Sequence, residues 1–276
     1  MSEAKILKEP LFWLSLFLIL ICWVLFSLPD GKLHLVFCDV GQGDATLITY
    51  RQTQVLIDGG PDQKVLQCLD QKMPFYDRRL EMIVLTHPEQ DHETGLIDVL
   101  ERYNVRYFVS NGLRKSSATF LELEKIKEEK KVLSVSVKTG DRIKIGPLGF
   151  SVLWPPKEFL QEDELNESSV VLKLSFGHFK ALLTGDISEK VEKKLDLKKV
   201  EVLKVAHHGS RFSTSAAFLE MIRPELAVIS VGQNRFGHPT KEVLESLNQV
   251  QAKVVRTDKV GAVEIVSDGW RWYHRP

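Results

Sequence analysis

The sequence has no excess of charge of either sign and contains little cysteine. Lysine and arginine together number 37, as do aspartate and glutamate, so the formal net charge is zero. Proteins that bind nucleic acid tightly are usually basic, so this balance argues against that class, although a catalytic groove can still be locally basic. The chain has three cysteines, at Cys22, Cys38 and Cys68. They form no CxxC pair, and their number is odd, so they do not indicate a framework of disulfides. We expect them to be small buried apolar residues.

Internal repeats, low-complexity segments and linkers rich in Pro, Gly or Ser are absent after residue 30. With 276 residues, of which 43% are hydrophobic and 27% charged, the chain has the composition of a globular protein and can bury a large core. We therefore expect one globular domain at residues 31–276 behind a short leader.

The leader holds the one long apolar run of the chain. Residues 11–28 are apolar except for Ser15 and Ser27, and about 18 residues at about 1.5 Å each cover about 27 Å, near the thickness of a bilayer core. The end of the run, Val24-Leu25-Phe26, lacks the small residues of a signal-peptide cleavage site. The sequence therefore predicts an uncleaved, single-pass transmembrane helix at 11–28, after an N-terminal flank at 1–10.

The charges that flank this run bear on its orientation. Lys5 and Lys8 precede it, and a cytoplasmic start would place the following domain outside the cytoplasm. Glu3, Glu9 and Lys32 make the bias small. We therefore expect a membrane protein whose globular domain lies on the extracytoplasmic side.

Each half of the domain begins with strand patterns and continues with helix patterns. In the first half we expect strands at 33–38, 45–50, 54–58, 81–86 and 106–109 and helices at 62–73, 95–103 and 118–130. In the second half we expect strands at 132–137, 142–145, 149–154, 169–176, 179–184, 201–206, 226–231, 253–256, 262–266 and 270–273 and helices at 187–196, 214–222 and 240–248. Two such halves predict an α+β fold in which two sheets pack face to face with helices outside, a four-layer αββα sandwich.

A group of possible metal ligands follows the expected strand at 81–86. Four of the six residues of His87-Pro88-Glu89-Gln90-Asp91-His92 carry an imidazole or a carboxylate. In an extended segment positions i and i+2 point the same way, so His87 and Glu89 can hold one ion, while Asp91 and His92 can face a second. A solvated polar loop is the alternative, but two histidines and two acids after a buried strand favour a metal site. Because Glu89 is a carboxylate, Mn²⁺ or Mg²⁺ is favoured over Zn²⁺.

Further acids and histidines stand at the ends of other expected strands. Asp58-Gly59-Gly60 ends one strand, Thr184-Gly185-Asp186 ends another, and His207-His208-Gly209-Ser210 follows a third. One such residue alone would be a turn or cap residue more often than a ligand, whereas several together indicate a site. The segment Asp39-Val40-Gly41-Gln42-Gly43-Asp44-Ala45 adds two acids that can orient ligands and two glycines that let the backbone approach a ligand.

These segments resemble those of metallo-β-lactamase-fold hydrolases, and in particular of their ComEC-like branch. The segment at 87–92 is similar to the HxHxDH ligand motif, with Glu89 in place of its second histidine. The segment at 39–45 resembles the DVGQGDA signature of the ComEC-like branch, and the likeness continues at 166–169 and 236–239. Because the resemblance covers nearly all of residues 33–273, it implies the metallo-β-lactamase fold.

The resemblance also implies a centre of two divalent metal ions that activates water for hydrolysis, with Mn²⁺ or Mg²⁺ favoured and Zn²⁺ as the alternative. The residues expected to hold the ions are His87, Glu89, Asp91, His92, Asp186 and His207. Asp91 is expected to act in catalysis as well, with Asp39 and Asp58 orienting the ligands. The residues expected to support the ligands or to contact substrate are Gln42, Asp44, Asn166, His208, Ser210 and His238.

Several of these roles have alternatives. His207 and His208 are nearly interchangeable as the later ligand. Asn166 stands where many members of the superfamily have a third histidine, so it is a weak ligand or none. His238 contacts a substrate phosphate, completes a metal site or is structural. Ser210 is expected to cap the next helix or to touch substrate, because activated water makes a serine nucleophile unnecessary.

Three functions remain open at this stage. The resemblance implies a nuclease that degrades DNA near the membrane in competence-type uptake. A single membrane helix cannot form a DNA channel, so a separate channel protein would be a partner. The second hypothesis is hydrolysis of a small phosphodiester or nucleotide unrelated to DNA uptake. The third is a catalytically weak, membrane-tethered binding protein, which Glu89 and Asn166 favour.

Overall fold

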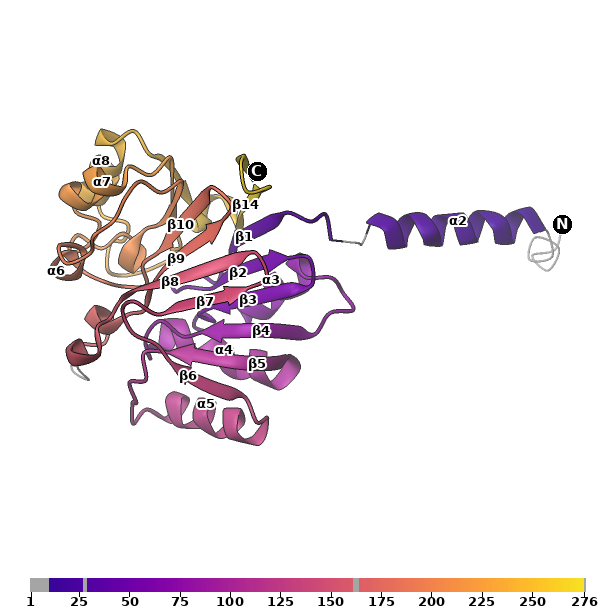
Figure 1. The fold of residues 1–276 in the computed structure, drawn as a ribbon, viewed down its shortest axis with the longest axis horizontal. Coiled ribbons are helices and arrows are strands. Elements are labelled where there is room, and N and C mark those ends of the chain that lie inside the picture. Colours follow the sequence, from indigo (N-terminus) through magenta and orange to yellow (C-terminus); the bar gives the residue numbers. More distant parts are fainter. Residues whose placement is uncertain (1–9, 27–28, 161–163, 276) are drawn as a thin grey trace.

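Two β-sheets face each other, and helices cover their outer sides (Figure 1). The computed structural model describes residues 10–26, 29–160 and 164–275. The first sheet has eight strands in the order β15-β14-β1-β2-β3-β4-β5-β6, and the second has seven in the order β13-β12-β11-β10-β9-β8-β7. The predicted α+β sandwich of four layers is confirmed.

The elements have the following bounds. The first sheet contains β1 (Leu33–Phe37), β2 (Thr46–Tyr50), β3 (Thr53–Ile57), β4 (Arg79–Val84), β5 (Asn104–Ser110), β6 (Leu133–Ser136), β14 (Val263–Ser267) and β15 (Trp272–Arg275). The second contains β7 (Arg142–Ile145), β8 (Leu148–Trp154), β9 (Val171–Phe176), β10 (Phe179–Leu183), β11 (Val202–Lys204), β12 (Leu226–Ile229) and β13 (Lys253–Arg256). The helices are α2 (Pro10–Phe26), α3 (Lys64–Lys72), α4 (Gln90–Arg102), α5 (Ala118–Glu129), α6 (Glu189–Glu192), α7 (Ala216–Ile222), α8 (Lys241–Gln249) and α9 (Thr257–Val260).

Apolar side chains fill the spaces between the layers. Strand β4 packs on both of its faces: Met82 and Val84 lie between the sheets, whereas Ile83 lies against the helices. Side chains of a strand alternate between its two faces, so a strand that is apolar on both faces must be covered on both. Helices α3, α4 and α5 cover the first sheet, and α6, α7 and α8 cover the second.

Two helices differ by more than two residues from their predicted bounds, and the others differ by one or two residues at an end. Helix α4 begins at Gln90 rather than at residue 95, so Asp91 and His92 lie in its first turn. The helix predicted at 187–196 is limited to the short α6. Leu195 and Leu197 are both buried in the apolar layer behind the second sheet, and a spacing of two residues does not keep side chains on one face of a helix.

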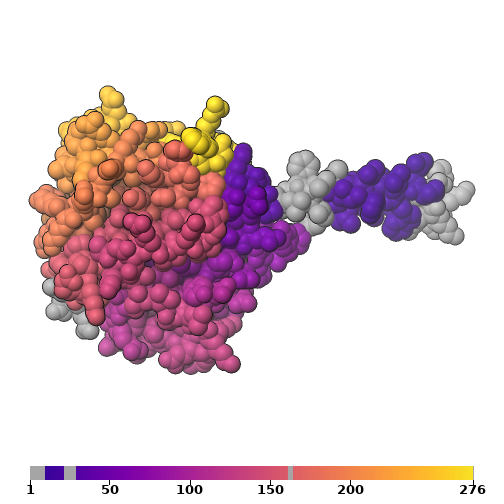
Figure 2. All heavy atoms as spheres, viewed as in Figure 1, coloured from indigo at the N-terminus to yellow at the C-terminus, as the bar shows by residue number. Residues whose placement is uncertain are grey.

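Helix α2 extends away from the two sheets (Figures 1 and 2). It has 17 residues, and residues 27 and 28 of the predicted anchor lie outside the described residues, as do residues 1–9 of the predicted flank. Within the described parts of the chain, no helix is both long enough and apolar enough to cross a membrane. The transmembrane helix therefore stays a prediction.

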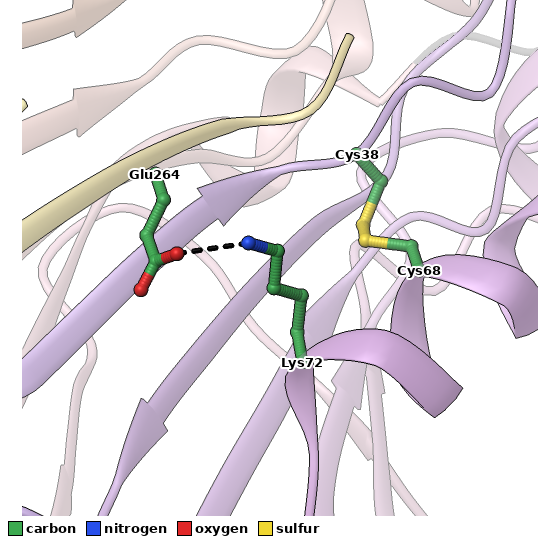
Figure 3. Close-up of a disulfide and its surroundings, with 4 residues drawn as sticks. All are labelled: Cys38, Cys68, Lys72 and Glu264. Carbon is green, nitrogen blue, oxygen red and sulfur yellow. Dashed lines mark hydrogen bonds and ion pairs between the residues drawn. A yellow bond between two sulfur atoms is a disulfide. The ribbon is translucent and has the colours of Figure 1, made fainter. Parts of the chain in front are cut away.

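A disulfide joins Cys38 to Cys68 across 30 positions of sequence (Figure 3). The expectation that both cysteines are plain buried apolar residues was wrong: both are buried, but they are bonded to each other. Cys38 directly follows β1 and Cys68 lies on α3, so neither spacing nor composition could reveal the pair. The bond fastens the start of the 39–45 segment to the outer helix layer.

Polar contacts around Glu264 join the same helix to the sheet edge. One carboxylate oxygen of Glu264, on β14, lies 2.8 Å from Nζ of Lys72 at the end of α3 (Figure 3). The other oxygen lies 2.7 Å from Nδ1 of His34 on β1 and 3.3 Å from Nη1 of Arg275 on β15. Glu264 therefore contacts three neighbouring elements at the end of the sandwich where β1 begins.

Candidate metal centre

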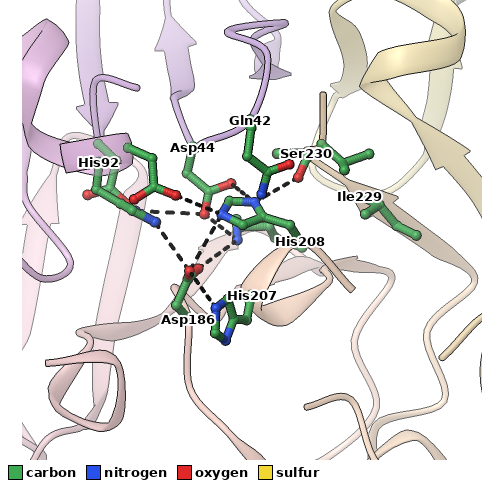
Figure 4. A network of polar contacts seen from close by, with 12 residues as sticks. Gln42, Asp44, His92, Asp186, His207, His208, Ile229 and Ser230 are labelled. Carbon is green, nitrogen blue, oxygen red and sulfur yellow. Dashed lines mark hydrogen bonds and ion pairs between the residues drawn. The ribbon is translucent and has the colours of Figure 1, made fainter. Parts of the chain in front are cut away.

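The candidate site lies where strands of both sheets end. Strands β3 and β4 run parallel, as do β10 and β11, so the residues that follow each pair emerge at one edge of a sheet. This arrangement brings the predicted strand-end residues Asp58, Asp186 and His208 to the same end of the sandwich, and the first turn of α4 adds His92. Figure 4 shows Asp186, His208 and His92 together.

Four buried side chains form the centre of the site. Asp44, His92, Asp186 and His208 each offer one ligand atom, and these atoms all lie within 4.8 Å of one another. Oδ2 of Asp186 lies 3.4 Å from Nε2 of His92 and 3.5 Å from Nε2 of His208. Asp186 therefore stands between the two imidazoles (Figure 4).

Unpaired atoms in this centre indicate that the donor set fits a metal ion. Nε2 of His87, His92 and His208 and Oδ1 of Asp186 are buried and have no hydrogen-bond partner among the described residues. A buried polar atom without a partner costs about 1–3 kcal/mol, and imidazole nitrogens together with carboxylate oxygens are the ligands of divalent transition metals. A divalent cation held by Asp186, His92 and His208 would satisfy their atoms together, and the ring of His87 lies 4.2 Å from that of His92.

Neighbouring side chains fix the orientation of the imidazoles. Asp58 accepts hydrogen bonds from Nδ1 of His92 at 2.9 Å and from the backbone N–H and the hydroxyl of Thr86, both at 2.8 Å. Nδ1 of His208 donates to the carbonyl of Ser230 at 2.9 Å. In both histidines Nδ1 is thereby engaged and Nε2 faces the centre, which is the arrangement that supports a metal-binding histidine.

Burial and neighbouring charges set the protonation of the centre. Burial alone would raise the pKa of Asp186, but the charges of His92 and His208 hold it well below its ordinary value. Burial would lower the pKa of His92, but the charges of Asp186 and Asp58 raise it well above its ordinary value. Burial and the charge of His92 hold the pKa of His87 well below its ordinary value. His87 is therefore neutral, as a metal ligand must be, whereas His92 must release a proton to bind metal.

Lys204 is a member of the site that the sequence analysis missed. Its Nζ lies 2.5 Å from Oδ2 of Asp44 and 3.9 Å from Oδ1 of Asp186. Burial would lower the pKa of Lys204, but the charges of Asp44 and Asp186 raise it, so the side chain is an ammonium. The available signal was a lysine inside the apolar run of β11, where every residue is buried.

The predicted ligands Asp91 and Glu89 lie beside the centre. Oδ2 of Asp91 is 3.3 Å from Nε2 of His208. Burial opposes ionisation of Asp91, but the neighbouring imidazole of His208 lowers its pKa to about 2. Glu89 is the residue before α4, and burial together with the charges of Asp91 and Asp186 raises its pKa. Both carboxylates therefore share the electrostatic environment of Asp186.

His207 reaches from the centre to the surface. Its Nε2 lies 3.9 Å from Oδ2 of Asp186, and the side chain is 31% exposed. His207 and His208 have φ values of 49° and 53° within a short 3₁₀ turn, a backbone conformation that is strained for residues other than glycine. This turn directs two consecutive imidazoles toward one carboxylate.

The structure separates the predicted roles within the 39–45 segment. Asp44 belongs to the centre and pairs with Lys204, whereas Asp39 is exposed and accepts a hydrogen bond from the N–H of Gly41 at 3.3 Å. Gln42 accepts from the N–H of Gly232 at 3.4 Å, beyond β12 of the second sheet. Asp39 therefore closes its own turn, and Gln42 ties the segment to the opposite sheet.

The remaining predicted residues lie around the centre. Asn166 lines a hollow of about 500 Å³ together with Asp186 and His207, and its Oδ1 is buried without a hydrogen-bond partner. The ring of His238 lies 5.7 Å from that of His207. Ser210 is buried and does not cap the next helix, because Ser215 accepts the capping hydrogen bond from the N–H of Phe218.

The sequence is similar to known proteins along most of its length. The profile of the Metallo-beta-lactamase superfamily matches residues 38–233. ComE operon protein 3 of Bacillus subtilis is 31% identical over 272 residues, covering 88% of this chain and 34% of that protein. Competence protein ComA of Neisseria gonorrhoeae is 29% identical over 248 residues, covering 86% of this chain and 33% of that protein. The chain therefore spans about a third of the length of these curated relatives.

Solved structures share the fold. The metallo-beta-lactamase fold protein YhfI from Bacillus subtilis superposes with a TM-score of 0.59 at 10% sequence identity, covering 84% of this chain and 99% of that chain. At such low identity the likeness is one of fold, and it agrees with the four layers described above.

Proposed function

The chain belongs to the metallo-beta-lactamase superfamily and is a metal-dependent hydrolase related to competence proteins, and from this premise we propose that it hydrolyses phosphodiester bonds of DNA. The observation that carries the proposal is the set of unpaired imidazole and carboxylate atoms at strand ends, beside an open hollow. The name of the gonococcal relative supports a role in competence.

The chain's own residues suggest how the site works. Two divalent ions, held by His87, Glu89, Asp91, His92, Asp186 and His208, with His207 as the alternative to His208, would supply Lewis-acid activation of water and of a phosphoryl oxygen. The carboxylate of Glu89 favours Mn²⁺ or Mg²⁺, with Zn²⁺ as the alternative. Asp58 keeps His92 oriented through Nδ1, and Lys204 offsets part of the negative charge of Asp44 and Asp186. Fixed charges in a buried site can stabilise the charge that develops on phosphate.

A small phosphodiester or nucleotide is the second candidate substrate. The formal net charge of zero favours it, because such a substrate does not need the extended basic surface that DNA usually does. The hollow beside His207 is open and lies next to the centre, so it can admit either substrate.

We also propose that residues 11–28 anchor the chain in a membrane with the hydrolase domain outside the cytoplasm. Leu11, Phe17 and Ile19 on α2 are more than half exposed, and burying such side chains in lipid is favourable. The disulfide between Cys38 and Cys68 supports an extracytoplasmic domain, because disulfides persist in oxidising compartments. A separate channel protein would then be the partner in DNA uptake. Protease digestion of intact and of lysed spheroplasts tests this orientation: a domain digested only after lysis would contradict it.

Hydrolysis of linear single- and double-stranded DNA by the full chain, with Mn²⁺, Mg²⁺ or Zn²⁺, tests the main proposal. The control is the double variant His87→Ala/Asp91→Ala, and a small chromogenic phosphodiester is assayed in parallel. Cleavage of DNA by the wild type alone is the expected result. Hydrolysis of the small diester without cleavage of DNA would transfer the assignment to the second candidate. If the chain hydrolyses neither substrate and binds no metal, the remaining hypothesis is a binding protein without catalytic activity.

A further inference from the structure

Two strongly exposed phenylalanines flank the surface end of the candidate metal centre. Phe212 is 70% exposed and Phe236 is 60% exposed, whereas Phe37, Phe108 and Phe150 are fully buried in the sandwich. Exposing a large apolar ring to water is unfavourable, so two such rings beside a polar site indicate a contact surface.

Both rings lie near His207, one through a shared hollow and the other through His238. Phe212 lines the hollow that also contains His207 and Asp186. Phe236 stacks on His238 with ring centroids 5.7 Å apart and an interplanar angle of 27°. The ring of His238 in turn lies 5.7 Å from the ring of His207. A strand of substrate bound at His207 can therefore reach both rings.

Hydrogen bonds fasten the loops that present these rings. The carbonyl of Phe212 accepts from the N–H of Glu189 at 2.8 Å, which ties its loop to α6. The side chain of Asn234 accepts from the N–H of Phe236 at 3.1 Å and of His238 at 3.0 Å, and donates to the carbonyl of His238 at 2.9 Å. The rings are thus held on ordered turns, which lowers the entropy cost of using them for binding.

Cationic side chains accompany both rings. Lys190 and Arg211 line the same hollow as Phe212. The guanidinium of Arg235 lies 5.7 Å from the ring centroid of Phe236. Aromatic faces next to cations that can contact a phosphate backbone are the combination used by proteins that bind single-stranded nucleic acid.

We propose that Phe212 and Phe236 stack on unpaired bases on either side of the phosphodiester that is cut, so that single-stranded DNA is the preferred substrate. In a duplex the faces of the bases are covered by their neighbours, and only an unpaired strand can turn its bases onto protein rings. This inference rests on the proposed function and adds the strandedness of the substrate and the residues that select it.

Binding in EDTA tests the inference without cleavage. The full chain is titrated against a fluorescent thymidine oligonucleotide, an abasic strand of the same length and a duplex of the same length, and anisotropy is recorded. The wild type should bind the thymidine strand about 25-fold or more tightly than the abasic strand, since stacking on each of the two rings is expected to contribute at least about a fivefold factor. The variants Phe212→Ala and Phe236→Ala should each lose part of this preference, and the double variant should lose it.

Phe75→Ala is the matched control, because Phe75 is 61% exposed and lies between α3 and β4, at the opposite end of the strands from the site. It should bind all three probes as the wild type does. Equal binding of thymidine and abasic strands by the wild type would overturn the inference, as would a double variant that keeps the preference. Failure of the proposed function is a separate result, namely no cleavage of any DNA when metal is added.

Discussion

Nζ of Lys204 lies 2.5 Å from Oδ2 of Asp44, and both side chains are almost completely buried. Lys204 ends β11 in the second sheet, whereas Asp44 precedes β2 in the first. The pair therefore links the two sheets directly beside the candidate metal centre. A buried charge whose partner is removed is strongly destabilising, so this contact should contribute to both stability and metal binding.

Lys204→Met should lower the free energy of unfolding by about 3–5 kcal/mol, because it leaves Asp44 charged and buried without its partner. Urea denaturation measures the change. Lys180→Met, at an exposed position of the neighbouring strand β10, is the control and should change stability by less than about 0.5 kcal/mol. The double variant Lys204→Met/Asp44→Asn should recover part of the loss. A Lys204 variant as stable as the wild type would contradict this role.

Cys38→Ser should destabilise the domain by about 2–4 kcal/mol, because the disulfide closes a loop across 30 positions and restricts the unfolded chain. Addition of a reductant to the wild type should produce a similar loss, and the variant should not respond to it further. Thermal unfolding with and without reductant measures both effects. Equal stability of the reduced and oxidised wild type would show that the disulfide does not stabilise the domain.

The contact between His34 and Glu264 predicts a pH dependence. The hydrogen bond to Glu264, opposed by burial, raises the pKa of His34 above 6.5, and the same bond lowers the pKa of Glu264 to about 2. The stabilisation of the folded state by His34 is fully present below the pKa of 6.5 that His34 has in the unfolded chain. It is lost as pH rises through the higher pKa of the folded state. The stabilisation of the folded state by Glu264 is present above the pKa of 4.5 that Glu264 has in the unfolded chain, and it is lost as pH falls toward 2.

The stability difference between the wild type and His34→Gln should therefore be largest between pH 4.5 and 6.5. It should amount to about 1 kcal/mol and shrink as pH rises further. Urea unfolding at a series of pH values measures it. His274→Gln is the control, because burial and Lys253 lower the pKa of His274 and no loss with rising pH is expected there. A difference for His34 that grows with pH would contradict the assignment.

Gly95 is not part of the candidate metal centre, but Gly95→Ala should distort that centre by moving α4. A Cβ atom at Gly95 would lie 2.0 Å from the carbonyl oxygen of Gly59, so α4 must move away from the segment that contains Asp58. We expect a loss of about 1–3 kcal/mol and weaker Mn²⁺ binding, because α4 carries His92. Denaturation and calorimetric titration measure the two effects. Gly149→Ala, where the nearest atom would lie 3.8 Å away, should change neither. An unaltered Mn²⁺ affinity in Gly95→Ala would contradict the coupling.

The sequence predicted those parts of the fold and site that depend on local pattern. Two halves that each begin with strand patterns and continue with helix patterns predicted the four layers, and the apolar layers on both faces of β4 agree with them. Asp58 and Asp186 were identified because each stands at the end of an apolar strand, Asp58 directly after it and Asp186 two residues further on. Lys204 was not identified, because its role depends on the ion pair with Asp44, which is distant in sequence. The pairing of Cys38 with Cys68 likewise depends on the packing of α3 against the end of β1.

The most direct test of the metal centre is anomalous diffraction at the manganese edge from crystals of the chain grown with Mn²⁺. We expect strong peaks in contact with Asp186, next to the Nε2 atoms of His92 and His208 that have no hydrogen-bond partner among the described residues. The same peaks should be absent from crystals of Asp186→Ala. Manganese bound only at surface carboxylates, with none at Asp186, would contradict the account.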